Sequence, residues 1–121
     1  MGNSKDDTMK AHERRISTRV PAQFKVNFIH EGDYLISHTR DISIDGMFLY
    51  TETPPAINEQ TELTFSIGDL HDVSLMAEVV WVNHTHSVKD SGMAVKFIDP
   101  QEDLITAILD IIHRVAVFPE Q

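Results

Sequence analysis

The sequence predicts a mainly β domain, a small antiparallel barrel or closed sandwich, that ends in a single α-helix. Two observations lead to this prediction. Six short stretches show the hydrophobic alternation of half-buried strands, and turn-forming residues separate them. After the last stretch, apolar residues recur at the spacing of an amphipathic helix. The chain has 121 residues, which is about the length of one domain.

The first two predicted strands form a hairpin. Phe24, Val26 and Phe28 alternate with polar residues, which is the pattern of a strand with one buried face. A turn follows at Gly32, where glycine supplies dihedral angles that other residues avoid. The second strand then covers residues 34–39.

Four more strands are predicted at residues 47–50, 63–67, 73–82 and 93–97. The third of these four is the longest, and one of its faces carries Val73, Leu75, Ala77, Val79 and Trp81. Because large aromatic side chains in such strands are usually buried, we expect Trp81 and Phe97 to lie in the core.

The final helix is predicted over residues 100–116. Asp99 is expected as the N-cap, Pro100 as the first helical residue, and Glu102 as the acidic residue that completes a capping box. Leu104 and Ile108 belong to an apolar stripe along the helix. We expect that stripe to pack on the β domain or on a partner.

Composition excludes several classes of function. The chain has no cysteine, which rules out disulfides and thiolate chemistry and fits a cytoplasmic location. No apolar run approaches the roughly 18 residues of a membrane span. The net charge of −9 argues against nucleic-acid binding. However, residues 1–25 carry a net charge of +3 and the remainder −12, a distribution that favours one compact anionic ligand.

The positive segment contains a cluster of three arginines, Arg14, Arg15 and Arg19. It follows a polar stretch, residues 1–12, that we interpret as a flexible tail. Guanidinium groups bind phosphates through two parallel hydrogen bonds and stack on flat rings. The cluster therefore indicates an arm that binds an anionic ligand, although a solvated basic stretch would have the same composition.

A second polar group follows the predicted hairpin. Asp41 and Ser43 alternate with isoleucine, so both side chains are expected on one face of an extended segment. A carboxylate can accept hydrogen bonds from the N1–H and amino groups of guanine. Gly46 permits a close approach of the backbone. An ordinary turn capped by Asp or Ser is the alternative interpretation.

Taken together, the two groups resemble a known family. Arg15-x-x-x-Arg19 followed by Asp41-x-Ser43-x-x-Gly46 is similar to the RxxxR and [D/N]xSxxG signature of PilZ domains, which are bacterial receptors for cyclic di-GMP. The likeness runs from about Glu13 to Val115 and includes the strand Ser91–Phe97. It implies a six-stranded antiparallel PilZ-type β-barrel with a C-terminal α-helix. The domain would cover 13–118, with a ligand-binding arm at 13–22, the barrel at 23–98 and the helix at 100–116.

The resemblance also implies a role for each signature residue. Arg15 and Arg19 would bind phosphates and guanine edges, while Asp41 and Ser43 would hold a guanine from the barrel surface. Gly46 would keep the backbone close to the ligand. In the family, an arginine at the position of Arg14 accompanies an intercalated dimer of the ligand, so two cyclic di-GMP molecules per chain are expected and no other cofactor.

Other functions have weaker support in the sequence. His84 and His86 could chelate a metal, but no clear third ligand accompanies them, so we expect a surface loop and no metal. No nucleophile-elbow pattern indicates an enzyme.

The expected function is a receptor that changes its surface on ligand binding and signals to an unidentified downstream protein. The alternative is an adaptor of the same fold, whose partner docks on the C-terminal helix and whose nucleotide binding is weak or absent.

Overall fold

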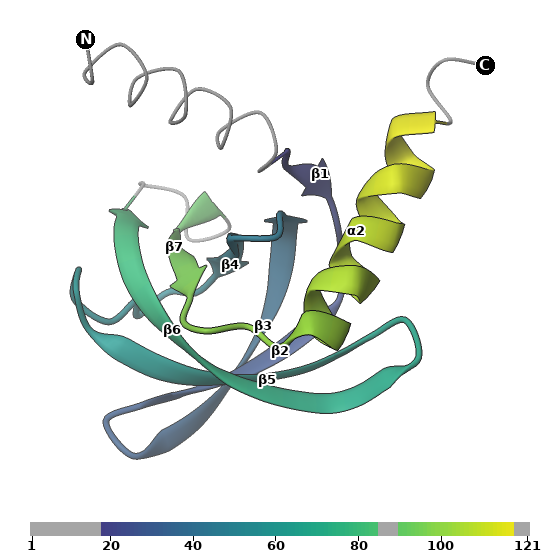
Figure 1. Ribbon diagram of the computed structural model, residues 1–121. Helices are drawn as coiled ribbons and strands as arrows, with labels where there is room; N and C mark the ends of the chain where they lie inside the picture. Colours follow the sequence, from purple (N-terminus) through teal and green to yellow (C-terminus); the bar gives the residue numbers. More distant parts are fainter. Residues whose placement is uncertain (1–17, 85–89, 118–121) are drawn as a thin grey trace, which may run out of the picture.

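The computed structural model describes residues 18–84 and 90–117, which form a closed barrel with one helix packed outside it (Figure 1). The strands are β1 (Val20–Pro21), β2 (Lys25–His30), β3 (Asp33–Ile42), β4 (Gly46–Tyr50), β5 (Gln60–Ile67), β6 (Leu70–Asn83) and β7 (Gly92–Phe97). Helix α2 (Glu102–Val117) follows them.

The sheet runs in the order β1-β3-β2-β5-β6-β7-β4, with every pairing antiparallel. Strand β3 also pairs with β4, so β2 to β7 close into a six-stranded barrel and leave β1 outside it. The predicted fold class is therefore confirmed as a barrel, and the sandwich is excluded. Strand β1 was not predicted, because two residues are too few to show an alternation.

The core consists of the inward-facing side chains of the barrel strands and one face of the helix. Val26, Phe28 and Leu63 are fully buried, as the alternation predicts. Leu104 and Ile108 of α2 join the same buried cluster, so the apolar stripe of the helix packs on the barrel. Among the described residues, no helix has the length and apolar character needed to cross a membrane.

The helix begins at Glu102 and not at Pro100. Its first backbone bond runs from the N–H of Ile105 to the carbonyl oxygen of Gln101, at 3.1 Å. Asp99 has a φ of 48°, whereas an N-cap residue adopts an extended conformation. The expected capping role of Asp99 is therefore wrong, because this residue forms the left-handed bend between β7 and the helix.

Trp81 lies outside the barrel, which contradicts the prediction that it belongs to the core. Val79 pairs with Val95 and Trp81 pairs with Ala94, so the register of β6 shifts by one residue between them. The additional residue, Val80, reverses the alternation from that point on. Trp81 is consequently 49% exposed. Phe97, by contrast, is buried as predicted.

The packing of α2 can be tested by comparing two leucines of the same helix. Leu104→Ala should reduce the free energy of unfolding by about 2–5 kcal/mol, because it leaves a cavity in the core. Leu109→Ala, at a residue that is 44% exposed, should cost much less. Urea denaturation of both variants measures the difference, and equal losses would show that the helix does not contribute to the core as described.

Candidate functional site

A row of outward-facing residues crosses four strands on the outside of the barrel. Asp41 of β3 pairs with Phe48 of β4, Phe48 with Ala94 of β7, and Ala94 with Trp81 of β6. Because side chains alternate along each strand, the row next to it faces inward, and its members are all buried: Ile42, Met47, Val95 and Val79. We call the outward set the Asp41–Trp81 row.

A β-bulge lies at each end of this row. The register of β3 shifts between Thr39 and Asp41, which leaves Arg40 as the additional residue, just as Val80 is in β6. A bulge redirects side chains and places two consecutive residues on the same side of a sheet. Arg40 is therefore exposed beside the partly exposed Asp41.

The Asp41 carboxylate pairs with two guanidinium groups. Its Oδ1 accepts a hydrogen bond from Arg19 Nη1 at 2.8 Å, and its Oδ2 accepts one from Arg40 Nε at 3.0 Å. The Asp41 side chain is only 17% exposed, so solvent screens these charge-assisted bonds less than it would at an open surface. The structure thus brings together Arg19 and Asp41, two predicted site residues that lie 22 positions apart in the chain.

The backbone around Arg19 is fixed by β1 and by a buried threonine. Pro21 of β1 pairs with Asp41 of β3, which places Arg19 beside that carboxylate. Thr39 Oγ1 donates a hydrogen bond to the carbonyl of Ala22 at 2.9 Å and accepts one from the N–H of Phe24 at 3.2 Å. These bonds attach the segment between β1 and β2 to β3.

Phe48 forms the centre of the row but is only 1% exposed. Arg40 Cζ lies over its ring, 4.0 Å from the centroid. Trp81 lies beside it with ring centroids 6.1 Å apart, and Tyr50 meets it edge-on at 5.5 Å. Sequence reasoning missed Arg40 and Phe48, because only the strand register reveals that they adjoin Asp41.

Ser43 does not share the exposed face of Asp41, contrary to expectation. It is 1% exposed, and its Oγ accepts hydrogen bonds from the N–H groups of Asp45 and Gly46 at 3.2 and 3.3 Å. Its own N–H donates to the carbonyl of Gly46 at 2.8 Å. Ser43 therefore caps the turn between β3 and β4. A contact between Ser43 and a ligand stays a prediction.

Gly46 is required by the contact between β4 and β7. A Cβ at this position would lie 1.9 Å from the carbonyl oxygen of Val95, so no other residue fits without moving a strand. The close backbone approach expected at Gly46 is thus to the neighbouring strand of the barrel.

Two of the predicted site residues, Arg14 and Arg15, lie outside the described residues, as does His86. In the described ranges, no group of three histidine or acidic side chains is arranged to hold a metal.

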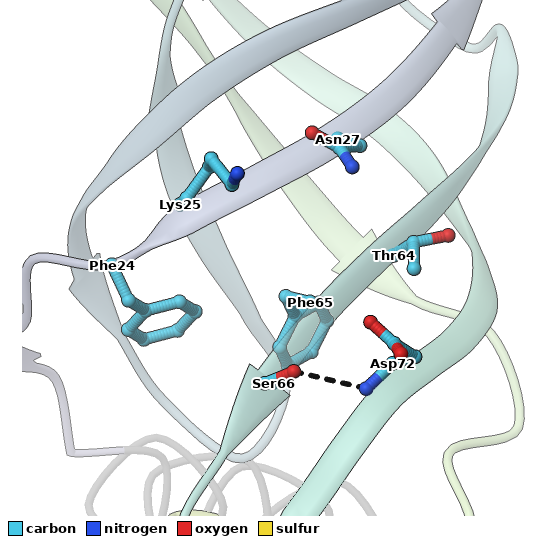
Figure 2. Close-up of a pocket in the computed structure, with 7 residues that line it drawn as sticks. All are labelled: Phe24, Lys25, Asn27, Thr64, Phe65, Ser66 and Asp72. Carbon is cyan, nitrogen blue, oxygen red and sulfur yellow. Dashed lines mark hydrogen bonds between the residues drawn. The ribbon is translucent and has the colours of Figure 1, made fainter.

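A separate pocket lies on the outside of β2, β5 and β6 (Figure 2). Within it, Ser66 Oγ accepts a hydrogen bond from the N–H of Asp72 at 2.9 Å, and Asn27 Oδ1 is buried without a partner in the described part of the chain. The lining residues are Phe24, Lys25, Asn27, Thr64, Phe65, Ser66 and Asp72. None of the predicted site residues is among them, so this pocket is distinct from the Asp41–Trp81 row.

Residues 13–114 match the PilZ domain family. The chain belongs to this family, and the resemblance seen in the sequence is confirmed. A comparison with curated protein sequences gave no match.

Solved structures share the PilZ fold at low sequence identity. The Bacillus subtilis inhibitor of motility MotI/DgrA superposes with a TM-score of 0.70 at 16% identity, over 86% of this chain and 51% of that one. Escherichia coli YcgR, in complex with c-di-GMP, superposes with a TM-score of 0.64 at 13% identity, over 88% of this chain and 48% of that one. The PilZ domain of CeSA from a cellulose-synthesizing bacterium superposes with a TM-score of 0.57 at 14% identity, over 83% of this chain and 99% of that one. This PilZ chain therefore spans about half the length of MotI/DgrA and YcgR.

The structural role of Gly46 predicts a large effect on stability. Gly46→Ala should destabilise the PilZ barrel by about 2 kcal/mol or more, because the new methyl group overlaps the backbone of β7. Gly32→Ala is the control, since its Cβ would meet nothing within 4 Å and only the positive φ should cost about 1 kcal/mol. Thermal unfolding followed by circular dichroism compares them, and a Gly46→Ala protein as stable as wild type would contradict the close contact.

Proposed function

We propose that this PilZ domain is a cytoplasmic receptor for cyclic di-GMP that has no enzymatic activity and signals through a change in its surface. The observation that carries the proposal is the ion pair between Arg19 and Asp41 at one end of the Asp41–Trp81 row. It joins the two halves of the PilZ signature at one place on the barrel.

The groups in the row suit the chemistry of this ligand, which carries two phosphates and two guanines. The Arg19 side chain is 45% exposed and has further N–H groups for a phosphate oxygen. Asp41 keeps acceptor capacity beyond its two ion pairs, because a carboxylate offers about four lone-pair sites. Trp81 presents a half-exposed ring on which a base can stack.

Proteins of the same fold support the proposal. Borreliella burgdorferi PlzA in complex with c-di-GMP superposes with a TM-score of 0.65, and the Klebsiella pneumoniae MrkH complex with c-di-GMP with 0.64. We propose that the present chain binds the same ligand.

The arm at residues 13–22 would complete the site. Arg14 and Arg15 precede Arg19 closely in the sequence, and their guanidinium groups would bind the phosphates that Arg19 does not reach. We propose that two ligand molecules bind as an intercalated dimer and that binding orders the arm, at an entropic cost which the charge-assisted bonds offset. The ordered arm would form part of a new docking face for a downstream protein.

Calorimetry with cyclic di-GMP tests the ligand and its stoichiometry. The wild-type protein should bind two molecules per chain, and Arg19→Ala and Asp41→Ala should each weaken binding by about 2–5 kcal/mol where the lost bond is desolvated. Lys25→Ala, which removes an exposed cation outside the row, is the matched control and should bind like wild type. Absence of binding by the wild-type protein would reject the receptor and favour the adaptor.

The role of Trp81 can be followed directly, because it is the only tryptophan in the chain. Stacking of a base on its half-exposed ring should change its fluorescence on titration with cyclic di-GMP. Trp81→Ala should weaken binding by about 1–3 kcal/mol, and Trp81→Phe should restore part of the loss. An unchanged emission, together with wild-type affinity of Trp81→Ala, would remove Trp81 from the site.

A further inference from the structure

Arg40 occupies a position in the site that the PilZ signature does not cover. The β3 bulge places it on the outer face of the barrel directly beside Asp41, and its side chain is 49% exposed. It adds a second guanidinium group beside the Asp41 carboxylate, since Arg19, Asp41 and Arg40 form one chain of ion pairs.

Two contacts hold the Arg40 guanidinium in place. Its Nε donates to Asp41 Oδ2 at 3.0 Å, and its Cζ lies 4.0 Å from the centroid of the Phe48 ring. The cation is therefore attracted both by the carboxylate and by the negative face of the ring. A long side chain fixed at both points loses less conformational entropy when a ligand binds to it.

These contacts leave part of the Arg40 side chain accessible to solvent. The guanidinium lies over the buried Phe48 ring, and the Arg40 side chain as a whole is 49% exposed, so a ligand can reach it from the side away from the ring. In the described part of the chain, Nε of Arg40 donates a hydrogen bond, whereas its Nη1 and Nη2 donate none. A planar, delocalised cation with one free face is a platform for a flat aromatic ring, which a lysine ammonium cannot provide.

We propose that Arg40 is a further ligand-contacting residue and that its free face stacks on one guanine base of cyclic di-GMP. This inference rests on the proposed function. Phe48 is then a positioning residue, because its side chain is only 1% exposed and its ring lies beneath the Arg40 guanidinium. Asp41 would both bind the ligand and orient Arg40.

Calorimetry on three single variants tests this proposal. Arg40→Lys keeps the positive charge and loses the planar face, so its affinity for cyclic di-GMP should fall about tenfold, as expected for a desolvated cation–π contact. Arg40→Ala should lose at least as much. Phe48→Leu keeps an apolar side chain and removes the ring, and we expect about a threefold loss from looser positioning.

A double-mutant cycle separates positioning from a general effect on the barrel. If Phe48 acts through Arg40, Phe48→Leu should cause no further loss of affinity in the Arg40→Ala background. Thermal unfolding of each variant confirms that the barrel is folded at the temperature of the titration. Lys25→Ala again serves as the control for removal of an exposed cation.

The outcomes distinguish the proposal from the function on which it rests. Wild-type affinity of Arg40→Lys and Arg40→Ala, with a wild-type protein that binds cyclic di-GMP, would overturn the role of Arg40 alone. A Phe48→Leu effect of the same size in both backgrounds would overturn the positioning role of Phe48. A wild-type protein that binds no cyclic di-GMP would overturn the proposed function, and the role of Arg40 with it.

Discussion

Closure of the barrel between β3 and β4 imposes the bulge on which the candidate site depends. Thr39 and Ile42 are both fully buried, although they lie three positions apart and strict alternation would place them on opposite faces. One additional residue in β3 resolves this conflict. The bulge therefore lets the core close, and it also turns Arg40 and Asp41 together toward the outside.

The same geometry sets the electrostatics of the row. The two guanidinium groups of Arg19 and Arg40 converge on one partly buried carboxylate, within a protein whose net charge is −9. Phe48 supplies an apolar floor beneath Arg40, which reduces the competition from water. This small cationic surface beside an aromatic ring is suited to a ligand that combines phosphates with flat bases, and much less to a long polyanion.

The sequence predicts much of the fold because alternation reports burial directly, as Val26 and Phe28 illustrate. It could not predict the bulges, since an inserted residue carries no marker of its own. Trp81 was therefore assigned to the wrong face, and Arg40 and Phe48 were missed. Ser43 shows a further limit: the same serine fits an exposed contact or a turn cap, and only the hydrogen bonds to Asp45 and Gly46 distinguish them.

We propose that cyclic di-GMP binds on the Asp41–Trp81 row. A titration followed by two-dimensional ¹H–¹⁵N NMR tests it most directly, because every backbone amide reports on its own surroundings. We predict that the largest shifts occur at Arg19, Asp41 and the Trp81 indole. Shifts confined to the pocket around Asn27 and Thr64 (Figure 2), or to the exposed face of α2, with the row unchanged, would contradict this account.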